Sequence, residues 1–178
     1  MKRIIVKIIA LLLSLFCVAA IWFYFTFWIP NRILLNSNVW ETDYQGNHVR
    51  REKVRKASQT LLWFWGGDHP SALIALQNVG NKDSIPCLIW ALKRQNKRWQ
   101  KEIAAGHTGL TCTSHMCALD GLTGMYKELG DDHKAWEKWW KETGRYLPFD
   151  EEKGQLATGR NSRHNQFIID SQKQENNE

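Results

Sequence analysis

The sequence predicts an all-α protein in which an N-terminal transmembrane helix precedes a small α-helical domain. Three observations support this prediction. Residues 8–30 form an apolar run without a charged side chain. Apolar residues then recur at helical spacing in the more polar chain that follows. Glycine and proline gather at a few points instead of being spread throughout, which is typical of helices joined by short turns.

The apolar run and its aromatic end predict a membrane anchor. At ~1.5 Å per residue, residues 8–30 are long enough to cross a hydrocarbon core of ~30 Å. Pro30 is expected to end the helix. The last third of the run carries aromatic side chains that favour the lipid headgroup layer: Trp22, Phe23, Tyr24, Phe25, Phe27 and Trp28. We therefore interpret residues 1–30 as a signal anchor.

A cleaved signal peptide is the alternative interpretation of this leader. Val18-Ala19-Ala20 offers small residues after a short apolar stretch, as signal peptidase sites do. Cleavage there would leave an N-terminus that begins Ile21-Trp22-Phe23, an apolar end that is costly in water. A lipoprotein site at Cys17 is disfavoured because the bulky Phe16 precedes it. The anchor is preferred, and cleavage stays open as the alternative.

Positive charges near the anchor predict its direction. Lys2, Arg3 and Lys7 precede the helix, whereas a lone Arg32 follows it closely. By the positive-inside rule, the N-terminus is cytoplasmic and the body lies on the extracytoplasmic side of the inner (plasma) membrane, after a single pass. This location makes nucleic acid a poor candidate partner for a chain of net charge +6.

Two basic runs in the body are candidate interaction surfaces. The first comprises Arg50, Arg51, Lys53, Arg55 and Lys56, and the second Lys93, Arg94, Lys97, Arg98 and Lys101. Such runs bind anionic lipid headgroups, phosphates or acidic partners, or are simply the solvated face of a helix. We select the basic face formed by Arg50, Arg51, Lys53 and Arg55 as the candidate binding site.

Residues 49–150 are predicted to form the helical domain, after a polar, loop-like linker over residues 31–48. The segment from Val49 to Trp65 has apolar residues at helical spacing and no breaker before Gly66-Gly67. Residues 71–95 are predicted to form a helix hairpin. Gly80 ends its first helix, and Ile85-Pro86 begins its second.

A second hairpin, with the same kinds of helix-start and helix-end signals, is predicted further along the chain. Its first helix begins at Ser114 and runs through Leu129 to Gly130. Asp131-Asp132 is expected to cap the next helix, in which Trp136, Trp139 and Trp140 face one way until Gly144. We interpret these tryptophans as core residues. The tail, residues 151–178, is predicted to be disordered apart from the apolar island Phe167-Ile168-Ile169.

These hairpins resemble a known repeat family. The segment from Ala72 to Leu92, with its Asn-Val-Gly-Asn-Lys-Asp turn before Ile85-Pro86, resembles the HEAT-like repeats of phycobilisome lyases. Matching Ala75–Gly80 with Ala118–Gly124 gives an offset within the roughly 40 to 47 residue period of such repeats. The resemblance covers less than half of the chain, which departs from the family in its few repeats and in a long insertion at residues 97–113. It implies a scaffold or binding role instead of a chemistry.

One cluster of side chains suggests a different activity. His107, Cys112, His115 and Cys117 are all capable of binding a metal, but their spacing matches no zinc signature. In an oxidising compartment, Cys112 and Cys117 can form a disulfide, and unpaired cysteines remain the third interpretation. No nucleophile elbow, phosphate loop or His-Glu-x-x-His motif is present in the sequence.

The sequence thus favours a membrane-tethered module that binds another envelope protein, with no catalytic activity and no cofactor. The alternative is a metal-binding or thiol-redox protein that works through the His107, Cys112, His115 and Cys117 cluster. A homo-oligomer held together by the Trp-rich helices is a third hypothesis.

Overall fold

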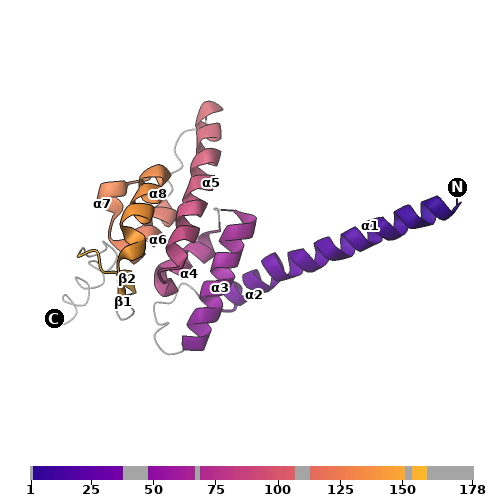
Figure 1. Ribbon diagram of the computed structural model, residues 1–178, viewed down its shortest axis with the longest axis horizontal. Coiled ribbons are helices and arrows are strands. Elements are labelled where there is room, and N and C mark those ends of the chain that lie inside the picture. Colours follow the sequence, from indigo (N-terminus) through magenta and orange to yellow (C-terminus); the bar gives the residue numbers. More distant parts are fainter. Residues whose placement is uncertain (1, 38–47, 67–68, 107–112, 151–153, 160–178) are drawn as a thin grey trace.

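The computed structural model describes residues 2–37, 48–66, 69–106, 113–150 and 154–159. Within these ranges the chain is helical apart from one short pair of strands, and a long apolar helix extends from the domain at the N-terminus (Figure 1). The predicted all-α class is therefore confirmed.

The N-terminal helix is continuous through Pro30. It comprises α1 (Lys2–Phe23), the π-helical turn η1 (Tyr24–Trp28) and α2 (Ile29–Leu35). The prediction that Pro30 ends the helix is wrong. The N–H of Ile29 bonds to the carbonyl of Tyr24, five residues back. This wider turn accommodates a proline ring that would clash in a regular α-helix.

The beginning of the expected linker is part of the folded domain. Residues 29–35 are helical, and the side chain of Leu34 is only 2% exposed and belongs to the hydrophobic core. The loop-like interpretation is therefore wrong for residues 31–35. Of the rest of the expected linker, Asn36 and Ser37 form a turn, His48 begins the next helix, and residues 38–47 lie outside the described residues.

The first predicted helices are present, and one is longer than expected. They are α3 (His48–Trp65), α4 (Pro70–Val79) and α5 (Ser84–Ala104). The expected insertion therefore begins as helix, because α5 continues through a polar stretch whose Lys, Arg and Gln side chains favour helix. Gly106, with φ +84°, follows its end.

The second hairpin contains a break that the sequence analysis missed. The expected single helix is divided into α6 (Thr113–Thr123) and α7 (Tyr126–Leu129), and α8 (His133–Glu142) follows. Gly124 adopts φ +67° at the break, and the Asp120 carboxylate accepts a hydrogen bond from the N–H of Tyr126 at 3.1 Å. As expected, Gly130 follows α7 with φ +57°, and Asp132 caps α8 by accepting from the N–H of Lys134 at 2.9 Å.

The helices pack around one core. α3 lies against α2 on one side and α4 on the other, and α6 and α8 pack beyond α4 and α5 (Figure 1). Trp136 is fully buried, whereas Trp139 and Trp140 are partly buried against the same core. The expectation of core tryptophans in α8 is confirmed for Trp136, while Trp139 and Trp140 lie at the edge of the core.

Part of the expected disordered tail is ordered. After the 3₁₀ turn η2 (Gly144–Tyr146), the strands β1 (Phe149–Asp150) and β2 (Gln155–Leu156) pair antiparallel. Leu156 is 2% exposed in the core, and the Thr158 hydroxyl donates to the carbonyl of Thr123 at 2.9 Å. The disorder prediction is therefore wrong for residues 154–159. Residues 160–178, with the island Phe167-Ile168-Ile169, lie outside the described residues.

Candidate functional site

The end of the N-terminal helix packs directly against the end of α3. The indole N–H of Trp65 donates to the Thr26 hydroxyl at 3.1 Å, and that hydroxyl donates to the carbonyl of Trp22 at 2.8 Å. The Trp65 ring lies 5.2 Å from the rings of Trp22 and Phe27 and 5.4 Å from that of Phe23. We call Trp22, Phe23, Thr26, Phe27 and Trp65 the junction. It joins the apolar helix to the domain through side chains that are close in space but far apart in sequence.

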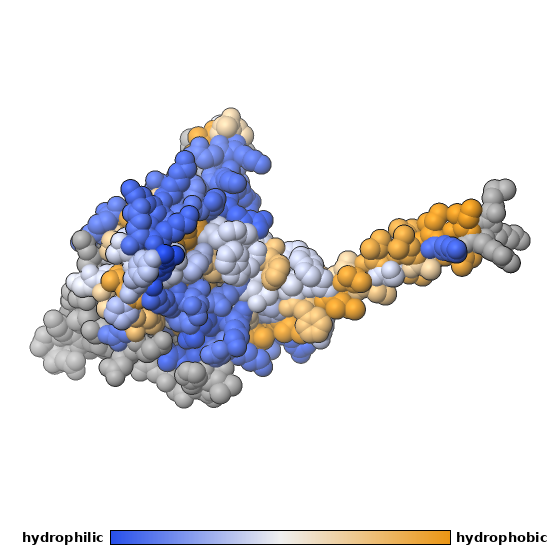
Figure 2. All heavy atoms as spheres, viewed as in Figure 1, coloured by the Kyte–Doolittle hydropathy of each residue, from blue (hydrophilic) through white to orange (hydrophobic). Residues whose placement is uncertain are grey.

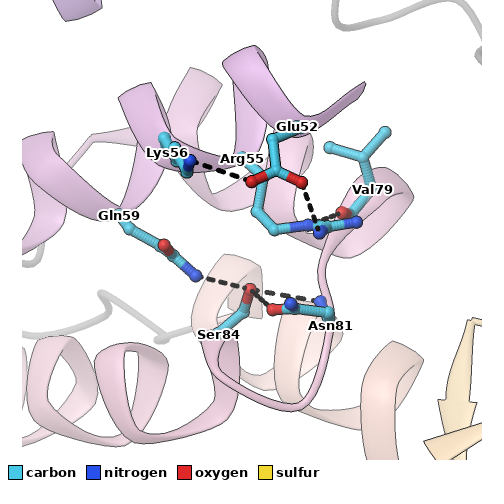
Figure 3. Close-up of polar contacts among 7 residues, drawn as sticks. All are labelled: Glu52, Arg55, Lys56, Gln59, Val79, Asn81 and Ser84. Carbon is cyan, nitrogen blue, oxygen red and sulfur yellow. Dashed lines mark hydrogen bonds and ion pairs between the residues drawn. The ribbon is translucent and has the colours of Figure 1, made fainter. Parts of the chain in front are cut away.

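A polar network fastens α3 to the turn between α4 and α5 (Figure 3). The Gln59 amide donates to the Ser84 hydroxyl at 3.0 Å. The same hydroxyl accepts from the backbone N–H of Asn81 at 3.2 Å and donates to the Asn81 side-chain oxygen at 3.1 Å. Ser84 is fully buried, so these bonds satisfy a hydroxyl that would otherwise be costly there. The sequence analysis did not identify this network, which joins residues far apart in the sequence.

The basic face selected from the sequence is divided by the fold. Lys53 is exposed, whereas Arg51 is half-buried and its Nε has no hydrogen-bond partner within the described residues. The side chain of Arg50 lies outside what the structure describes. Arg55 turns inward: its Nε donates to the carbonyl of Val79 at 2.7 Å, and it pairs with Glu52 at 3.9 Å (Figure 3).

Arg55 therefore has a structural role, which gives a prediction. It satisfies a carbonyl at the end of α4, where helix carbonyls lack partners and cations are favoured. Arg55→Met is expected to lower the free energy of unfolding by about 1.5–3 kcal/mol, the range for hydrogen bonds to charged groups. Urea unfolding of the full chain in mild detergent, followed by far-UV circular dichroism, measures the loss.

Lys56→Met is the matched control on the same helix. Its ammonium lies 2.9 Å from Glu52, but its side chain is 73% exposed, so its loss is expected to cost less than about 0.5 kcal/mol. Equal, small losses for the two variants would contradict the structural role of Arg55.

The metal-capable cluster is only half described. His107 and Cys112 lie outside the described residues. On α6, His115 is buried and Cys117 is exposed, and residues two apart on a helix point to different sides. Among the described residues, no group of three His, Cys, Asp or Glu side chains is arranged to hold a metal. The metal-binding alternative and the Cys112–Cys117 disulfide stay predictions.

The described cysteines of the domain differ in their surroundings. Burial raises the pKa of the Cys87 thiol to about 12, and its Sγ lies 3.7 Å from the carbonyl of Gln59. Cys117 is accessible at the surface. Partial loss of solvation there, together with the charge of Asp120, still raises the pKa of its thiol. Both shifts favour the neutral thiol over the reactive thiolate.

Thiol labelling tests this difference and the disulfide. In reduced full chain, we expect a bulky maleimide to modify Cys117 at least about tenfold faster than Cys87, because only Cys117 is accessible. Mass spectrometry of peptides measures the two rates, with Cys117→Ser as the control. In protein isolated without reductant, a Cys112–Cys117 disulfide would block labelling of Cys117 until reduction. Immediate labelling of Cys117 would exclude the disulfide.

Comparison with known proteins adds no relative: no family model, no curated protein and no solved structure matches the chain.

Proposed function

We propose that this chain is a single-pass membrane protein whose helical domain sits at the outer face of the inner membrane and binds another envelope protein without catalytic activity. The junction is the observation that supports this proposal most. The apolar helix runs into the domain as α2, whose Leu34 lies in the core, and Trp65 bonds to Thr26 at the point of entry. A helix joined to the domain in this way orients it, whereas a loose tether would let it tumble.

The exposed surface of the helix supports the membrane span. Within the described residues, one helix is long and apolar enough to cross a membrane, the continuous helix Ile4–Leu35. The large apolar side chains from Ile4 to Ile21 are exposed, and the helix that carries them extends away from the domain, as the orange spheres of Figure 2 show. An apolar surface of this extent is costly in water and favourable in lipid.

The stacking of the helices supports a scaffold. The first helices of the two hairpins, α4 and α6, pack on each other, and α5 packs on both α6 and α8. Glycines allow the close approach: a Cβ at Gly80 would meet the side chain of Leu122 at 2.9 Å, and one at Gly121 would meet Gln77 at 3.3 Å. Stacked helix pairs of this kind present surfaces for protein partners. The HEAT-like identity of the two hairpins is part of this proposal.

The first half of α3 is the candidate partner surface. Lys53 is exposed there, and it lies ~18 Å along the helix axis from Trp65 in the junction. Lys53 and the equally exposed Lys56, one turn further along α3, are therefore placed to meet an acidic surface of another envelope protein at a distance from the anchor. Arg55 is left out because its guanidinium is held by Val79.

Site-specific crosslinking in the native membrane tests the proposal. We expect a photoreactive amino acid at position 53 to give a discrete adduct that disappears with Lys56→Glu, which reverses the exposed charge one turn away. The matched control places the probe at Lys141 on α8, with charge reversal at Lys134 and Lys138. These cations are also exposed but lie on another element. No adduct at position 53, or the same adduct from both positions, would contradict the partner site.

A fusion settles the direction of the chain. A reporter that is active in only one compartment, attached after Glu178, is expected to be active outside the cytoplasm. Activity in the cytoplasm alone would reverse the orientation, and a soluble, extracytoplasmic body would indicate that the leader is cleaved.

A further inference from the structure

The junction fixes the depth at which the domain meets the membrane. At ~1.5 Å per residue, the uncharged chain from Ile8 to Phe27 spans ~30 Å, the thickness of the hydrocarbon core. The aromatic turn η1 then lies where the hydrocarbon core meets the headgroups. Because Trp65 bonds to Thr26 in this turn, the C-terminal end of α3 lies at the same level.

The end of α3 has the composition of a membrane interface. Trp63, Phe64 and Trp65 follow one another and are 43%, 51% and 39% exposed. Three consecutive large aromatic side chains are costly in water but are favoured at the headgroup layer. Trp22 contacts both Phe64 and Trp65, so this aromatic end continues the aromatic belt of the anchor.

The second basic run, on α5, begins beside the aromatic end of α3. The Trp90 ring of α5 lies 5.0 Å from that of Trp63, and the Arg94 guanidinium stacks over Trp90 at 4.7 Å. Arg94 also lies beside Gly66, where an added Cβ would be 3.5 Å from the guanidinium. Arg94 is therefore held next to the aromatic end of α3.

The cations of α5 line up on one face of the helix. Arg94, Lys97 and Lys101 follow Trp90 at intervals of four, three and four residues, and all three cations are exposed. No acidic side chain pairs with any of these three among the residues that the structure describes. We call Trp90, Arg94, Lys97 and Lys101 the α5 face.

Another face of α5 is already occupied by the domain. The Lys93 ammonium lies 2.8 Å from the Glu137 carboxylate of α8, and Asn96 donates to the carbonyl of Asp131 at 2.9 Å. The hydrogen bond from Lys93 lowers the pKa of Glu137. These contacts fix the rotation of α5 about its axis, so the α5 face stays turned toward the aromatic end of α3.

The direction of α5 suits a membrane surface. In Figure 1, α5 runs across the direction of α1, and its C-terminal half projects beyond the other helices. Hydrophilic spheres cover this part of the domain in Figure 2, and at its end Ile103 is 48% exposed. Lysine and arginine stems reach several ångströms from a helix, which lets their charges meet headgroups from above.

We propose that the α5 face and the aromatic end of α3 dock together on anionic phospholipid headgroups in the leaflet from which α1 emerges. This inference rests on the membrane anchoring proposed above. Positive charge without acidic partners complements the phosphates, and the surface is continuous with the anchor. The anchor makes the contact intramolecular, so three cations suffice where a free domain would need more. The two basic runs thus have different partners, lipid for α5 and protein for α3.

Hydrogen exchange of the full chain in nanodiscs tests the proposal. Nanodiscs of phosphatidylcholine alone are compared with nanodiscs rich in phosphatidylglycerol, and peptides that cover residues 94–104 are followed by mass spectrometry. Each cation near an anionic surface contributes roughly a fivefold gain in binding. We therefore expect exchange in this segment to slow at least about fivefold in the anionic nanodiscs, and high salt to remove the effect.

Matched charge variants assign the effect to the α5 face. Lys97→Gln with Lys101→Gln is expected to abolish the protection, and both side chains are exposed, so the fold is retained. Arg94→Gln is tested separately because Arg94 stacks on Trp90. Lys127→Gln with Lys134→Gln removes the same charge from α7 and α8 and should leave the protection unchanged.

The amides of α1 distinguish the two proposals. If α1 is protected in both nanodiscs and residues 94–104 exchange equally in both, the lipid contact of α5 is wrong while the anchor stands. If α1 itself exchanges freely, the anchoring fails first. Equal loss of protection in the α5 and the control variants would show a nonspecific charge effect and would also overturn the assignment to α5.

Discussion

Replacing Trp136 with alanine is expected to lower the free energy of unfolding by about 3–5 kcal/mol, the range for removing a large aromatic side chain from a core. Trp136 is fully buried, and its indole N–H donates to the carbonyl of Gly130 at 2.8 Å. Its ring also meets that of Trp139 edge-on at 5.9 Å. The substitution removes the packing, the ring contact and the hydrogen bond together. A loss of this size is a large part of the stability of a small domain.

Two further variants separate these contributions. Trp136→Phe keeps most of the ring but leaves the carbonyl of Gly130 without its donor, so an intermediate loss is expected. Lys138→Ala changes an exposed position on the same helix and should stay within about 0.5 kcal/mol of the unaltered protein. Far-UV circular dichroism during urea unfolding is the measurement, because tryptophan fluorescence would change with the mutation itself. A Trp136→Ala loss as small as that of Lys138→Ala would contradict the described core.

Local sequence signals predicted most of the helices. Apolar spacing located α3, and Gly80 and Gly130 marked helix ends that the structure confirms. These signals work because they depend on the backbone of a few neighbouring residues. Gly124 is a further local signal that could have indicated the break between α6 and α7. The break depends in addition on Asp120, whose carboxylate binds the N–H of Tyr126 across it.

The errors arise where distant contacts decide the structure. Pro30 is an ordinary stop signal, and nothing local indicates that a π turn will accommodate it. Leu156 is a lone apolar residue in a polar tail, and it is ordered because the core has a place for it. Leu34 lies in a stretch that was predicted to be a linker, and it too is ordered because it packs into the core.

The candidate site shows how far a charge run can be interpreted. Judged by charge alone, Lys53 and Arg55 belong to the same basic face. In the structure, Lys53 is exposed, whereas Arg55 is half-buried and donates to the carbonyl of Val79. Helical spacing could have separated them, because Arg55 precedes the buried Ser58 by three residues and Leu62 by seven. The junction could not be predicted, since it brings Trp65 to Thr26 across 39 positions of sequence.

Leu34→Ala is expected to destabilise the domain by about 2–5 kcal/mol, because Leu34 is 2% exposed in the shared core. Its neighbour Leu35 is 73% exposed, so Leu35→Ala removes the same atoms from the same helix and should stay within about 0.5 kcal/mol of the unaltered protein. Urea unfolding of the full chain in mild detergent, followed by circular dichroism, compares the two.

The difference between these leucines tests whether the anchor is part of the domain. If α2 completes the core, the domain is stable only with the helix proposed to anchor it, and its orientation follows from its folding. Equal, small effects at both positions would mean that the core forms without α2. The anchor would then act as a tether, and the fixed orientation on which both the protein partner site and the lipid contact of α5 depend would lose its support.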